Sequence, residues 1–482
     1  MTVINPDKVC RAEVVVIGSG PGGSVVAATL AQGGKDVLLI EEGQNRSQNS
    51  CAPFSYAEMK QKYRNNGITA AFGKPNIAYA EGSCVGGGSE VNSGLYHRAP
   101  DAVIEAWAKD FMVDDFSPVT MANSFAACEA VMQPSIYPGV LPVQSQILRR
   151  GAETENMSSS DVPRLVDFSG KKDEQGVAIS SRRAMSKTYL PEFFKAGGQL
   201  LPETRVHRLK RHGRRWQIFA HHGTGRKLQI DADNVFVCAG AIHSPALLQR
   251  SGIRMNVGQT LSMQPMIKLT AAFDEPVNFQ NMGIAGEQVK EQGSEYSFGC
   301  SISSRAHLAI NLAADVDGPE YALQNHRNLV SYYVMSCGTM DGSVRVLPGF
   351  NDPLVRYQIS TRELNNLGQG MQGLARVLFS AGATQVFTGL ADSPVVTNQQ
   401  QVDTLPGTLS NSVNNIMTVH LMASCPMGED RKSTAVNSWG QVHGQPGLHI
   451  SDVSILCASP GVNPQGTVMA LAKRNSDYFL NN

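Results

Sequence analysis

The chain has 482 residues, a length that predicts about two or three domains with large hydrophobic cores. Lys plus Arg and Asp plus Glu total 41 each, so no net basic field favours nucleic acid or an anionic membrane surface. Nine scattered cysteines, never in a Cys-x-x-Cys pair, offer no metal site and are typical of a reducing compartment. No secretory signal or long apolar window is present, so we expect a cytoplasmic protein with a small-molecule ligand.

Residues 13–43 have the pattern of a strand, a glycine-rich turn, a helix and a second strand. Residues 14–17 and 37–40 are apolar runs without polar alternation, which is typical of strands buried on both faces of a parallel sheet. A helical pattern begins near Gly22 and continues through Leu30. The order of these elements predicts a βαβ unit.

Three glycines and one acid in this unit predict a dinucleotide site. Gly18 allows the tight turn, Gly20 lets backbone approach a pyrophosphate, and Gly23 lets the helix pack closely on the strand. The pyrophosphate would lie at the helix N-terminus. Glu41, 18 residues after Gly23, is placed to accept hydrogen bonds from a ribose and disfavours NADP. An ordinary glycine-rich turn is the alternative, but the flanking strand, helix and acid favour the dinucleotide.

A second glycine-rich stretch lies at residues 81–100. Apolar and aromatic residues alternate with its glycines, so we interpret it as a loop against a cofactor rather than a flexible surface loop. Residues 101–163 are predicted to be a partly helical cover near the site. Helices are predicted at residues 56–63, 102–109, 143–155 and 181–197.

Residues 200–240 predict a return to β structure. Segments 200–209, 215–220 and 227–230 alternate like antiparallel strands, and residues 234–240 again have the buried-strand pattern. Pro245 near the start and Gly252 at the end delimit a following helix.

The pattern changes at Pro265. We expect an α/β protein, α+β overall, in which residues 1–265 and 409–482 form a Rossmann-like cofactor domain with a parallel sheet. Residues 266–408 would form a substrate-binding domain built on an antiparallel sheet with helices. Its strands are predicted at 267–273, 307–312, 329–335, 343–347 and 355–359, with a helix at 362–381.

A second dense cluster of motifs lies in residues 418–480. Residues 450–452 end another buried strand, and residues 465–479 have helical spacing. Asn463 and Pro464 stand directly before this helix, where they are typical of a cap and first turn. The helix N-terminus would stabilise negative charge on a bound ring.

Together these stretches resemble the glucose-methanol-choline (GMC) oxidoreductases, an FAD-dependent family, with the long-chain fatty alcohol oxidase and choline dehydrogenase-like branch most similar in pattern. The resemblance extends over the whole chain. It rests on GSGPGG with Glu41, GSCVGGGSEVN, a strand pair near Val206, GAIHSPALLQRSGI, HLMASCPMG, ISDVS and PGVNPQGT. It implies an alcohol oxidase or dehydrogenase that acts on CH–OH donors, with oxygen or another electron acceptor as second partner.

The resemblance also implies which residues hold FAD. Those near the ADP half would be Gly18, Gly20, Gly23 and Glu41, with Val206 meeting the adenine through its backbone. Those near the flavin and pyrophosphate would be Gly86, Gly87, Ser89 and Asn92, with Ala239 and Gly240 completing the wall. Those near the ribityl chain and pyrimidine ring would be Asp452, Pro464, Gln465 and Thr467.

The catalytic pair of the family falls on His420 and Asn463. A neutral His420 would take the hydroxyl proton while the carbinol carbon delivers hydride to flavin N5. Asn463 would orient the hydroxyl and hold the oxygen as charge develops. A histidine on a mixed strand is more often structural, but its position in HLMASCPMG favours the base. His97 and His243 lie in cofactor-proximal motifs and are weaker candidates.

Departures from the family pattern alter three expectations. Val91 stands where some members attach FAD covalently to a histidine, so we predict non-covalent FAD. Ser83 replaces an arginine of the glycine loop, which removes one phosphate partner, and Gln264 replaces the histidine of a His-Pro pair.

Two other functions stay open. One is a lyase, desaturation or decarboxylation step in specialised metabolism on the same scaffold. The other is a non-catalytic nucleotide-binding protein. An alcohol that bleaches flavin absorbance argues against the second, and an aldehyde or ketone product argues against the first. The sequence predicts no metal and leaves the oligomeric state open.

Overall fold

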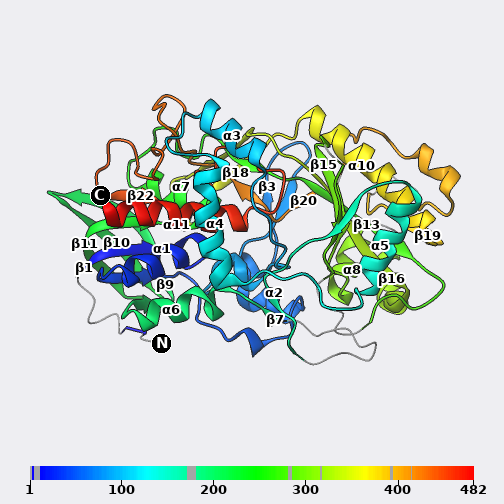
Figure 1. The fold of residues 1–482 in the computed structure, drawn as a ribbon, viewed down its shortest axis with the longest axis horizontal. Helices are drawn as coiled ribbons and strands as arrows, with labels where there is room; N and C mark the ends of the chain where they lie inside the picture. Colours follow the sequence, from blue (N-terminus) through cyan, green and yellow to red (C-terminus); the bar gives the residue numbers. More distant parts are fainter. Residues whose placement is uncertain are drawn as a thin grey trace.

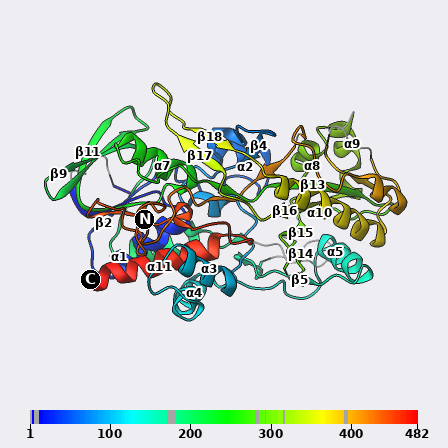
Figure 2. The same cartoon turned by 90° about the horizontal axis from the view of Figure 1, so that it is seen from above.

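The computed structural model describes residues 3–4, 11–170, 181–279, 285–291, 293–314, 317–390, 395–413 and 415–482. Two large sheets form its two halves, one with seven strands and one with nine (Figures 1 and 2). Chain segments from the N-terminal, central and C-terminal regions meet in the seven-stranded sheet, so the first half is assembled from distant parts of the sequence.

The seven-stranded sheet has the order β8-β2-β1-β11-β10-β9, with β22 paired to β11. The sheet has a parallel part, formed by β8, β2, β1, β11 and β22. Strand β10 pairs antiparallel with both β11 and β9. Its strands are β1 (Arg11–Ile17), β2 (Val37–Ile40), β8 (Gln199–Leu201), β9 (Thr204–His212), β10 (Arg215–His222), β11 (Lys227–Val237) and β22 (Leu448–Ile450). The predicted Rossmann-like arrangement of parallel strands is therefore present.

Helix α1 (Pro21–Gln32) connects β1 to β2 and is buried on almost every side. Because its residues are small or aliphatic, α11 (Gln465–Asn481) packs directly against it, and α4 (Pro118–Met132) packs on α11. Helix α7 (Gly240–Arg250) follows β11. Figure 1 shows α1 and α11 side by side over the sheet.

Strand β11 differs from the sequence prediction. The segments predicted separately at 227–230 and 234–240 form one continuous strand, β11. Its first half pairs antiparallel with β10, and its second half pairs parallel with β1 and β22. The pattern changes along the strand because its surroundings change from a half-exposed hairpin to a sheet covered on both faces. The predicted strand 200–209 is likewise divided into β8 and β9.

The nine-stranded sheet has the order β3-β4-β20-β13-β16-β15-β14-β5, with β19 paired to β13. All of its pairs are antiparallel except β20 with β4. Its strands are β3 (Thr69–Ala71), β4 (Ile77–Tyr79), β5 (Ser159–Asp161), β13 (Met266–Ala272), β14 (Glu287–Val289), β15 (Tyr296–Cys300), β16 (Leu329–Ser336), β19 (Gln385–Phe387) and β20 (Met417–Thr418).

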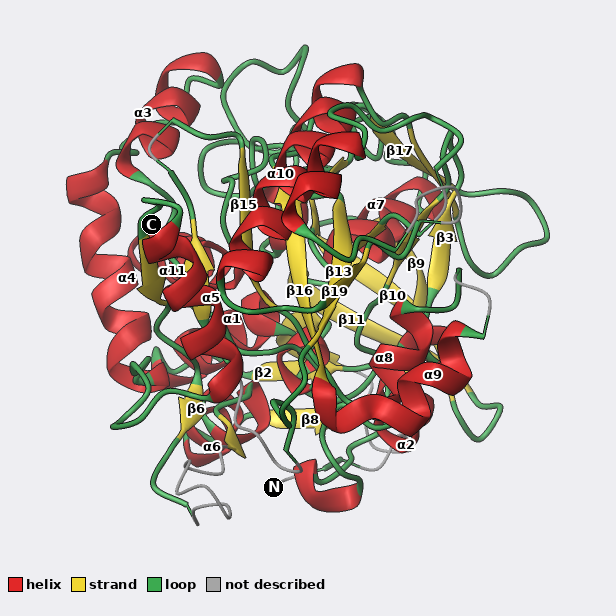
Figure 3. Cartoon of the chain, turned by 90° about the vertical axis from the view of Figure 1, so that its right-hand side faces the viewer, coloured by secondary structure: helices red, strands yellow, loops and turns green. Residues whose placement is uncertain are grey.

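Helix α10 (Thr361–Ser380) covers one face of this sheet, lying across β13, β15 and β16 (Figure 3). It begins at Thr361 because Ser360 and Glu363 form a reciprocal capping box. Its buried leucines and methionine recur every three or four residues, as a helix with one apolar face requires. Helix α8 (Arg305–Asn311) packs on β13 and β16 from the opposite face, where Leu308 meets Ala272.

Smaller elements complete the fold. The remaining helices are α2 (Tyr56–Lys62), α3 (Asp101–Asp110), α5 (Val143–Thr154), α6 (Tyr189–Lys195) and α9 (Gly318–Asn325). Three two-stranded sheets pair β6 (Val166–Asp167) with β7 (Ser181–Arg182), β12 (Ser262–Met263) with β21 (Leu421–Met422), and β17 (Gly342–Arg345) with β18 (Leu354–Tyr357).

Two predicted elements are wrong. The predicted strand 307–312 is helix α8, because the Ser304 hydroxyl accepts the His307 N–H as an N-cap and the buried residues have helical spacing. A short apolar run fits either period, so the local pattern did not separate them. The predicted helix 181–197 is confined to α6, while Ser181 and Arg182 pair with β6.

The division into residues 266–408 and the rest of the chain stays a prediction. Strands β3, β4, β5 and β20 come from outside 266–408 and join the nine-stranded sheet. Helix α5 also packs against α10. Short segments from outside residues 266–408 therefore form part of the half that contains the nine-stranded sheet.

Gly23 and Gly20 form a matched pair for testing the close packing of α1. A Cβ at Gly23 would lie 1.9 Å from the Gly18 carbonyl oxygen, whereas one at Gly20 meets no atom within 4 Å. Although alanine favours a helix by about 1 kcal/mol, we expect overpacking in Gly23→Ala to lower the free energy of unfolding by about 1–3 kcal/mol. Gly20→Ala should change it less. Thermal unfolding followed by circular dichroism measures both, and equal melting temperatures for Gly23→Ala and wild type would contradict the contact.

Candidate active site

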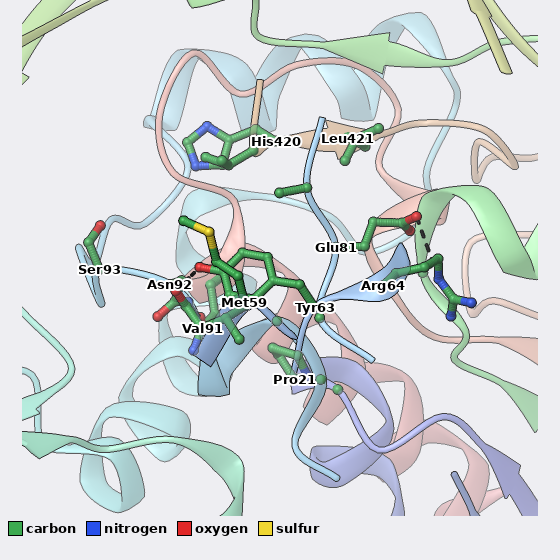
Figure 4. A pocket seen from close by; sticks show the side chains of 18 of the residues that line it. Pro21, Met59, Tyr63, Arg64, Glu81, Val91, Asn92, Ser93, His420 and Leu421 are labelled. Atoms are coloured by element: carbon green, nitrogen blue, oxygen red, sulfur yellow. Dashed lines mark hydrogen bonds and ion pairs between the residues drawn. The ribbon is translucent and has the colours of Figure 1, made fainter. Parts of the chain in front are cut away.

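A cavity of about 730 Å³ lies between the two sheets. Its wall includes the ends of β1 and β2, the residues that follow β11, the loop at 87–95, the start of α11, and residues of β13, β16 and α8. Figure 4 shows Pro21, Met59, Tyr63, Asn92 and His420 around this space. The chain segments singled out in the sequence therefore meet at one cavity.

The turn between β1 and α1 forms one end of the cavity, which we call the nucleotide end. Gly18 has φ +104°, and a Cβ there would lie 2.2 Å from the Cys238 carbonyl oxygen. A Cβ at Gly22 would lie 2.1 Å from the Ser451 carbonyl oxygen, and one at Gly87 would lie 2.8 Å from Gly20 Cα. Glycine thus permits three backbone segments to converge here.

The space beside Gly20 fits the pyrophosphate of a dinucleotide. Gly20 lines the cavity, and an added Cβ would have no protein atom within 4 Å. Gly20 is also the N-cap of α1, so the first N–H groups and the positive end of the helix dipole lie at this point. These residues therefore fit the predicted cofactor at the position that the sequence assigns to its phosphates.

Glu41 is buried and keeps acceptor capacity for a ligand. Its Oε2 accepts from the Ser19 N–H at 2.9 Å and the Ser19 hydroxyl at 2.7 Å, and its Oε1 accepts from the Gly43 N–H at 2.8 Å. Burial raises the pKa of Glu41, while these hydrogen bonds oppose the rise. A carboxylate accepts about four hydrogen bonds, so one position is left for a ribose hydroxyl.

Asp452 differs from Glu41 because its carboxylate is fully used inside the protein. One oxygen accepts from the Gly240 N–H at 2.8 Å and from the Ser244 hydroxyl. The other accepts from the N–H and hydroxyl of Ser454 at 2.8 and 2.6 Å. Burial raises the pKa of Asp452. The side chain therefore joins β22 to the start of α7, and only its backbone is free to meet a ribityl chain.

His420 and Asn463 meet at the cavity wall. Asn463 Nδ2 lies 3.1 Å from His420 Nε2, and both residues line the cavity. With the amide donating, Nε2 carries the lone pair and the ring proton lies on Nδ1. Burial lowers the pKa of His420 to about 4, and His97 adds to the effect. Within the described part of the chain, His420 Nδ1 and Asn463 Oδ1 are buried without a hydrogen-bond partner.

The backbone around His420 is fixed by a short network. The His420 N–H donates to the Thr418 hydroxyl at 3.1 Å, and that hydroxyl lies 2.9 Å from the Gln264 carbonyl oxygen. Gln264 is fully buried, and its Nε2 donates to the Ser459 hydroxyl oxygen at 3.0 Å. Gln264 thus links the His420 segment to the loop that precedes Asn463.

The prediction that Asn463 caps the last helix is wrong. Helix α11 begins at Gln465 with Pro464 at the N-cap position and no side-chain cap. Asn463 instead turns its amide toward His420, which leaves the helix N-terminus open to the cavity wall. Asn92 also approaches this point, donating to Gln465 Oε1 at 2.6 Å.

The two weaker histidine candidates lie in different places. His97 does not line the cavity; its Nε2 lies 3.1 Å from Gln288 Oε1, and burial lowers the pKa of His97 to about 4. It lies behind Asn463, whose side chain affects its pKa. His243 lines the cavity with its Nε2 3.7 Å from Glu81, which also pairs with Arg64 (Figure 4). His97 therefore borders the pair formed by His420 and Asn463 from outside the cavity, whereas His243 pairs with Glu81.

Most predicted cofactor residues lie on the cavity wall. These are Gly18, Gly20, Glu41, Gly87, Asn92, Val206, Ala239, Gly240, Asp452, Pro464 and Gln465. Gly23, Gly86, Ser89 and Thr467 do not line it. Ser89 holds the loop instead, donating to the Gly86 carbonyl at 2.7 Å and accepting from the Met185 N–H at 3.0 Å. The Gly86 N–H donates to the Ser19 hydroxyl at 2.9 Å.

Several wall residues were not singled out from sequence. They include the apolar residues Met59, Tyr63 and Ile68, and, on the side of the nine-stranded sheet, Met266, Lys268, Tyr333, Met335 and His307. No motif marks them, but Lys268 interrupts an apolar strand, and a charged residue in such a run could have indicated a functional position.

The described residues contain no group of three or more His, Cys, Asp or Glu side chains arranged to hold a metal ion. The eight cysteines in the described ranges are free thiols; Cys10 lies outside those ranges. In the part of the chain that the structure covers, no helix is both long and apolar enough to cross a bilayer.

Comparison with known proteins places these features in a family. The GMC oxidoreductase models match residues 59–266 and 339–472, and the pyridine nucleotide-disulphide oxidoreductase model matches residues 12–97. An uncharacterised GMC-type oxidoreductase, y4nJ of Sinorhizobium fredii, is 37% identical over 99% of this chain and 96% of its own length. The long-chain-alcohol oxidase FAO1 of Arabidopsis thaliana is 26% identical over 95% of this chain and 65% of its own.

Solved structures agree with the fold. Pyridoxine 4-oxidase from Mesorbium loti superposes with a TM-score of 0.74 at 17% identity, covering 98% of this chain and 99% of that one. At this identity the likeness bears on the fold. Because the family models match more than half of the chain and the bacterial relative spans nearly all of it, the chain belongs to the GMC oxidoreductase family.

Proposed function

We propose that the protein is an FAD-dependent oxidoreductase that oxidises the CH–OH group of an alcohol to an aldehyde or ketone. The observation that carries the proposal is the 3.1 Å approach of His420 Nε2 and Asn463 Nδ2 at the cavity wall. A base and a hydrogen-bond donor this close can both contact one hydroxyl oxygen. The family includes long-chain-alcohol oxidases, which supports the same class of substrate.

His420 would act as the base. A substrate hydroxyl replaces the Asn463 amide as donor to Nε2, and its proton moves to that nitrogen. Because burial holds the pKa of His420 near 4, the imidazole is neutral at physiological pH and its lone pair is available. The same low pKa makes it a weak base, so proton removal must be coupled to the loss of hydride from the carbinol carbon.

Asn463 would hold the substrate oxygen. Its Nδ2 donates to the oxygen as negative charge grows on it, which stabilises the transition state more than the ground state. Once the proton has moved, the His420 Nε2–H donates back to the carbonyl oxygen of the product, which also keeps the Asn463 contact.

FAD, when bound, supplies the acceptor for the hydride and passes the two electrons to oxygen or another acceptor. We propose that the β1–α1 turn holds its pyrophosphate, Glu41 its ribose, and residues 463–465 its flavin side. Asn463 directly precedes the residues that begin α11, so one loop positions both the substrate oxygen and the cofactor. The Val91 side chain has no nucleophilic atom, which supports non-covalent binding.

Anaerobic mixing of the purified yellow protein with a panel of alcohols tests the proposal. We expect loss of the flavin absorbance together with an aldehyde or ketone product. Admission of air then shows whether oxygen restores the absorbance. A flavin that no alcohol reduces would reject alcohol oxidation, and a cleaved or decarboxylated product formed while the flavin stays oxidised would favour the lyase alternative.

The His420→Ala variant tests the base. Removing a general base slows proton transfer by about two to four orders of magnitude, so we expect flavin reduction by an alcohol to slow by that factor with FAD still bound. His449→Phe is a matched control: burial lowers the pKa of His449 to about 4 as well, yet it stacks on Phe236 away from the cavity. Rates unchanged in His420→Ala would remove His420 from the mechanism.

The pH dependence follows from burial of His420. The folded pKa of about 4 lies below the ordinary 6.5, so the imidazole stays neutral until the pH approaches 4. We expect kcat/KM for a neutral alcohol to keep its full value through pH 6.5 and to fall with a midpoint near 4. An acid limb centred at 6.5 contradicts the buried base. Stability also falls as the pH drops through this window, because the unfolded chain binds the proton first, so unfolding is measured at each pH.

Non-covalent attachment predicts that acid precipitation releases the flavin. Val91 offers no atom for a flavin bond, so the yellow colour should appear in the supernatant and the pellet should be colourless. Absorbance of the two fractions is the measurement. Flavin that stays with the denatured protein would indicate a covalent link at another residue.

A further inference from the structure

Lys268 lines the part of the cavity that faces the nine-stranded sheet, which we call the substrate end. Lys268 lies on β13 between Ile267 and Leu269, whose side chains are fully buried in the core. Because successive strand residues face opposite sides, Lys268 shares its face with Met266, and both line the cavity. Among the described wall residues of the substrate end, Lys268 is the one side chain that carries a full charge.

Charge is distributed unequally between the two ends. The described carboxylates of the cavity wall, Glu41, Glu42, Glu81 and Asp452, belong to the nucleotide end. Of the four arginines on the described wall there, three form ion pairs: Arg64 with Glu42 at 3.1 Å, Arg182 with Glu58 at 2.6 Å, and Arg205 with Asp352 at 3.3 Å. The fourth, Arg250, donates to the Asn351 carbonyl oxygen. No ion pair joins Lys268 to any acid that the structure describes, and burial alone lowers its pKa, to about 8. The amine is therefore mostly protonated at neutral pH without a counter-ion.

The groups around Lys268 are polar but uncharged. His307 on α8 lines the same region, and burial together with the Lys268 charge lowers its pKa to about 3, so it is neutral. Its Nδ1 lies 2.8 Å from the Ser304 hydroxyl. The Asn311 amide donates to the Ser331 hydroxyl at 2.9 Å, and Gln144 spends its amide on the Ser301 and Ser331 carbonyls. None of these groups neutralises the ammonium.

We propose that Lys268 is the counter-ion for an anionic oxygen group on the substrate, so that the alcohol carries a carboxylate or comparable anion at its far end. The inference rests on the proposed function, since it takes the carbinol to lie at His420. A partly buried ammonium without a partner costs free energy, and a bound anion removes that cost while forming a charge-assisted hydrogen bond.

The wall between the two positions indicates the middle of the substrate. Met266, Tyr333, Met335 and Met417 form an apolar cluster there and all line the cavity. Met266 pairs with Met417, which stands three residues before His420. Lys268 lies two residues further along β13, a rise of about 7 Å. The fitting substrate is therefore a carbinol, an apolar spacer of several bonds, and an anion.

Matched acids and esters test the inference on the holoenzyme. ω-Hydroxyalkanoates of increasing length and para-(hydroxymethyl)benzoate are compared with their methyl esters by the second-order rate constant of anaerobic flavin reduction. We expect this rate constant to be higher for the acids in wild type. Lys268→Met should lower it for the acids by about 10- to 100-fold and leave it nearly unchanged for the esters. Lys268→Arg should keep most of the preference. ω-Hydroxyalkyl phosphates show whether the anion is a phosphate instead of a carboxylate.

The outcomes separate this inference from the proposed function. Reduction by esters and acids with equal efficiency in wild type, or an equal loss for both in Lys268→Met, overturns the inference and leaves alcohol oxidation intact. Flavin that no alcohol reduces defeats the proposed function. In that case the ω-hydroxyalkanoates still test Lys268 as ligands that bind without reducing the flavin. The change they cause in the flavin spectrum should weaken in Lys268→Met. It should stay the same in Lys109→Met, because Lys109 is an exposed lysine on α3.

Discussion

The convergence of backbone segments on the β1–α1 turn is the constraint on which the rest of the structure depends. The turn touches the Cys238 carbonyl through Gly18 and the Ser451 carbonyl through Gly22, distances that leave no room for a Cβ. The glycine loop approaches the same turn through Gly87. Because these contacts hold parts of the chain more than 400 residues apart, the helix that starts after Asn463 is fixed relative to β1. The position of the pair formed by His420 and Asn463 follows from that packing.

Charged and neutral side chains are distributed unequally along the cavity. At the nucleotide end, buried carboxylates are satisfied by backbone and hydroxyl donors, with Glu41 retaining one acceptor position. In the middle, burial keeps His420 neutral beside Asn463. At the substrate end, Lys268 stands without a counter-ion among the described residues. FAD would bring ribose hydroxyls to Glu41 at the nucleotide end. An anionic alcohol would bring its hydroxyl to His420 and its negative charge to Lys268.

Sequence patterns predicted the elements that depend on the order of neighbouring residues. The buried runs at 14–17 and 37–40, the glycine turn between them and the long amphipathic helix α10 have unambiguous periods, and the structure confirms them. The family resemblance brought His420 and Asn463 together, which no local pattern does. Residues 307–312 were mistaken for a strand because a short apolar run fits two periods, and only the Ser304 cap decides for a helix.

Other features depend on contacts between distant residues and were not predictable from one sequence. The pairing of β4 with β20 and of β5 with β14 draws outside segments into the nine-stranded sheet. The saturation of Asp452 by Gly240, Ser244 and Ser454 is visible only once α7 and β22 are packed. Lys268 visibly interrupts an apolar strand in the sequence, but its lack of a described counter-ion became clear only in the cavity.

The central claim is that a hydroxyl held between His420 and Asn463 loses its proton while the carbinol carbon gives up hydride. Flavin reduction by an alcohol deuterated at the carbinol carbon, measured anaerobically in a single turnover at saturating substrate, tests it most directly. The account predicts that reduction is clearly slower with the deuterated alcohol in wild type, because the C–H bond breaks in that step. Identical reduction rates for the two alcohols would contradict it.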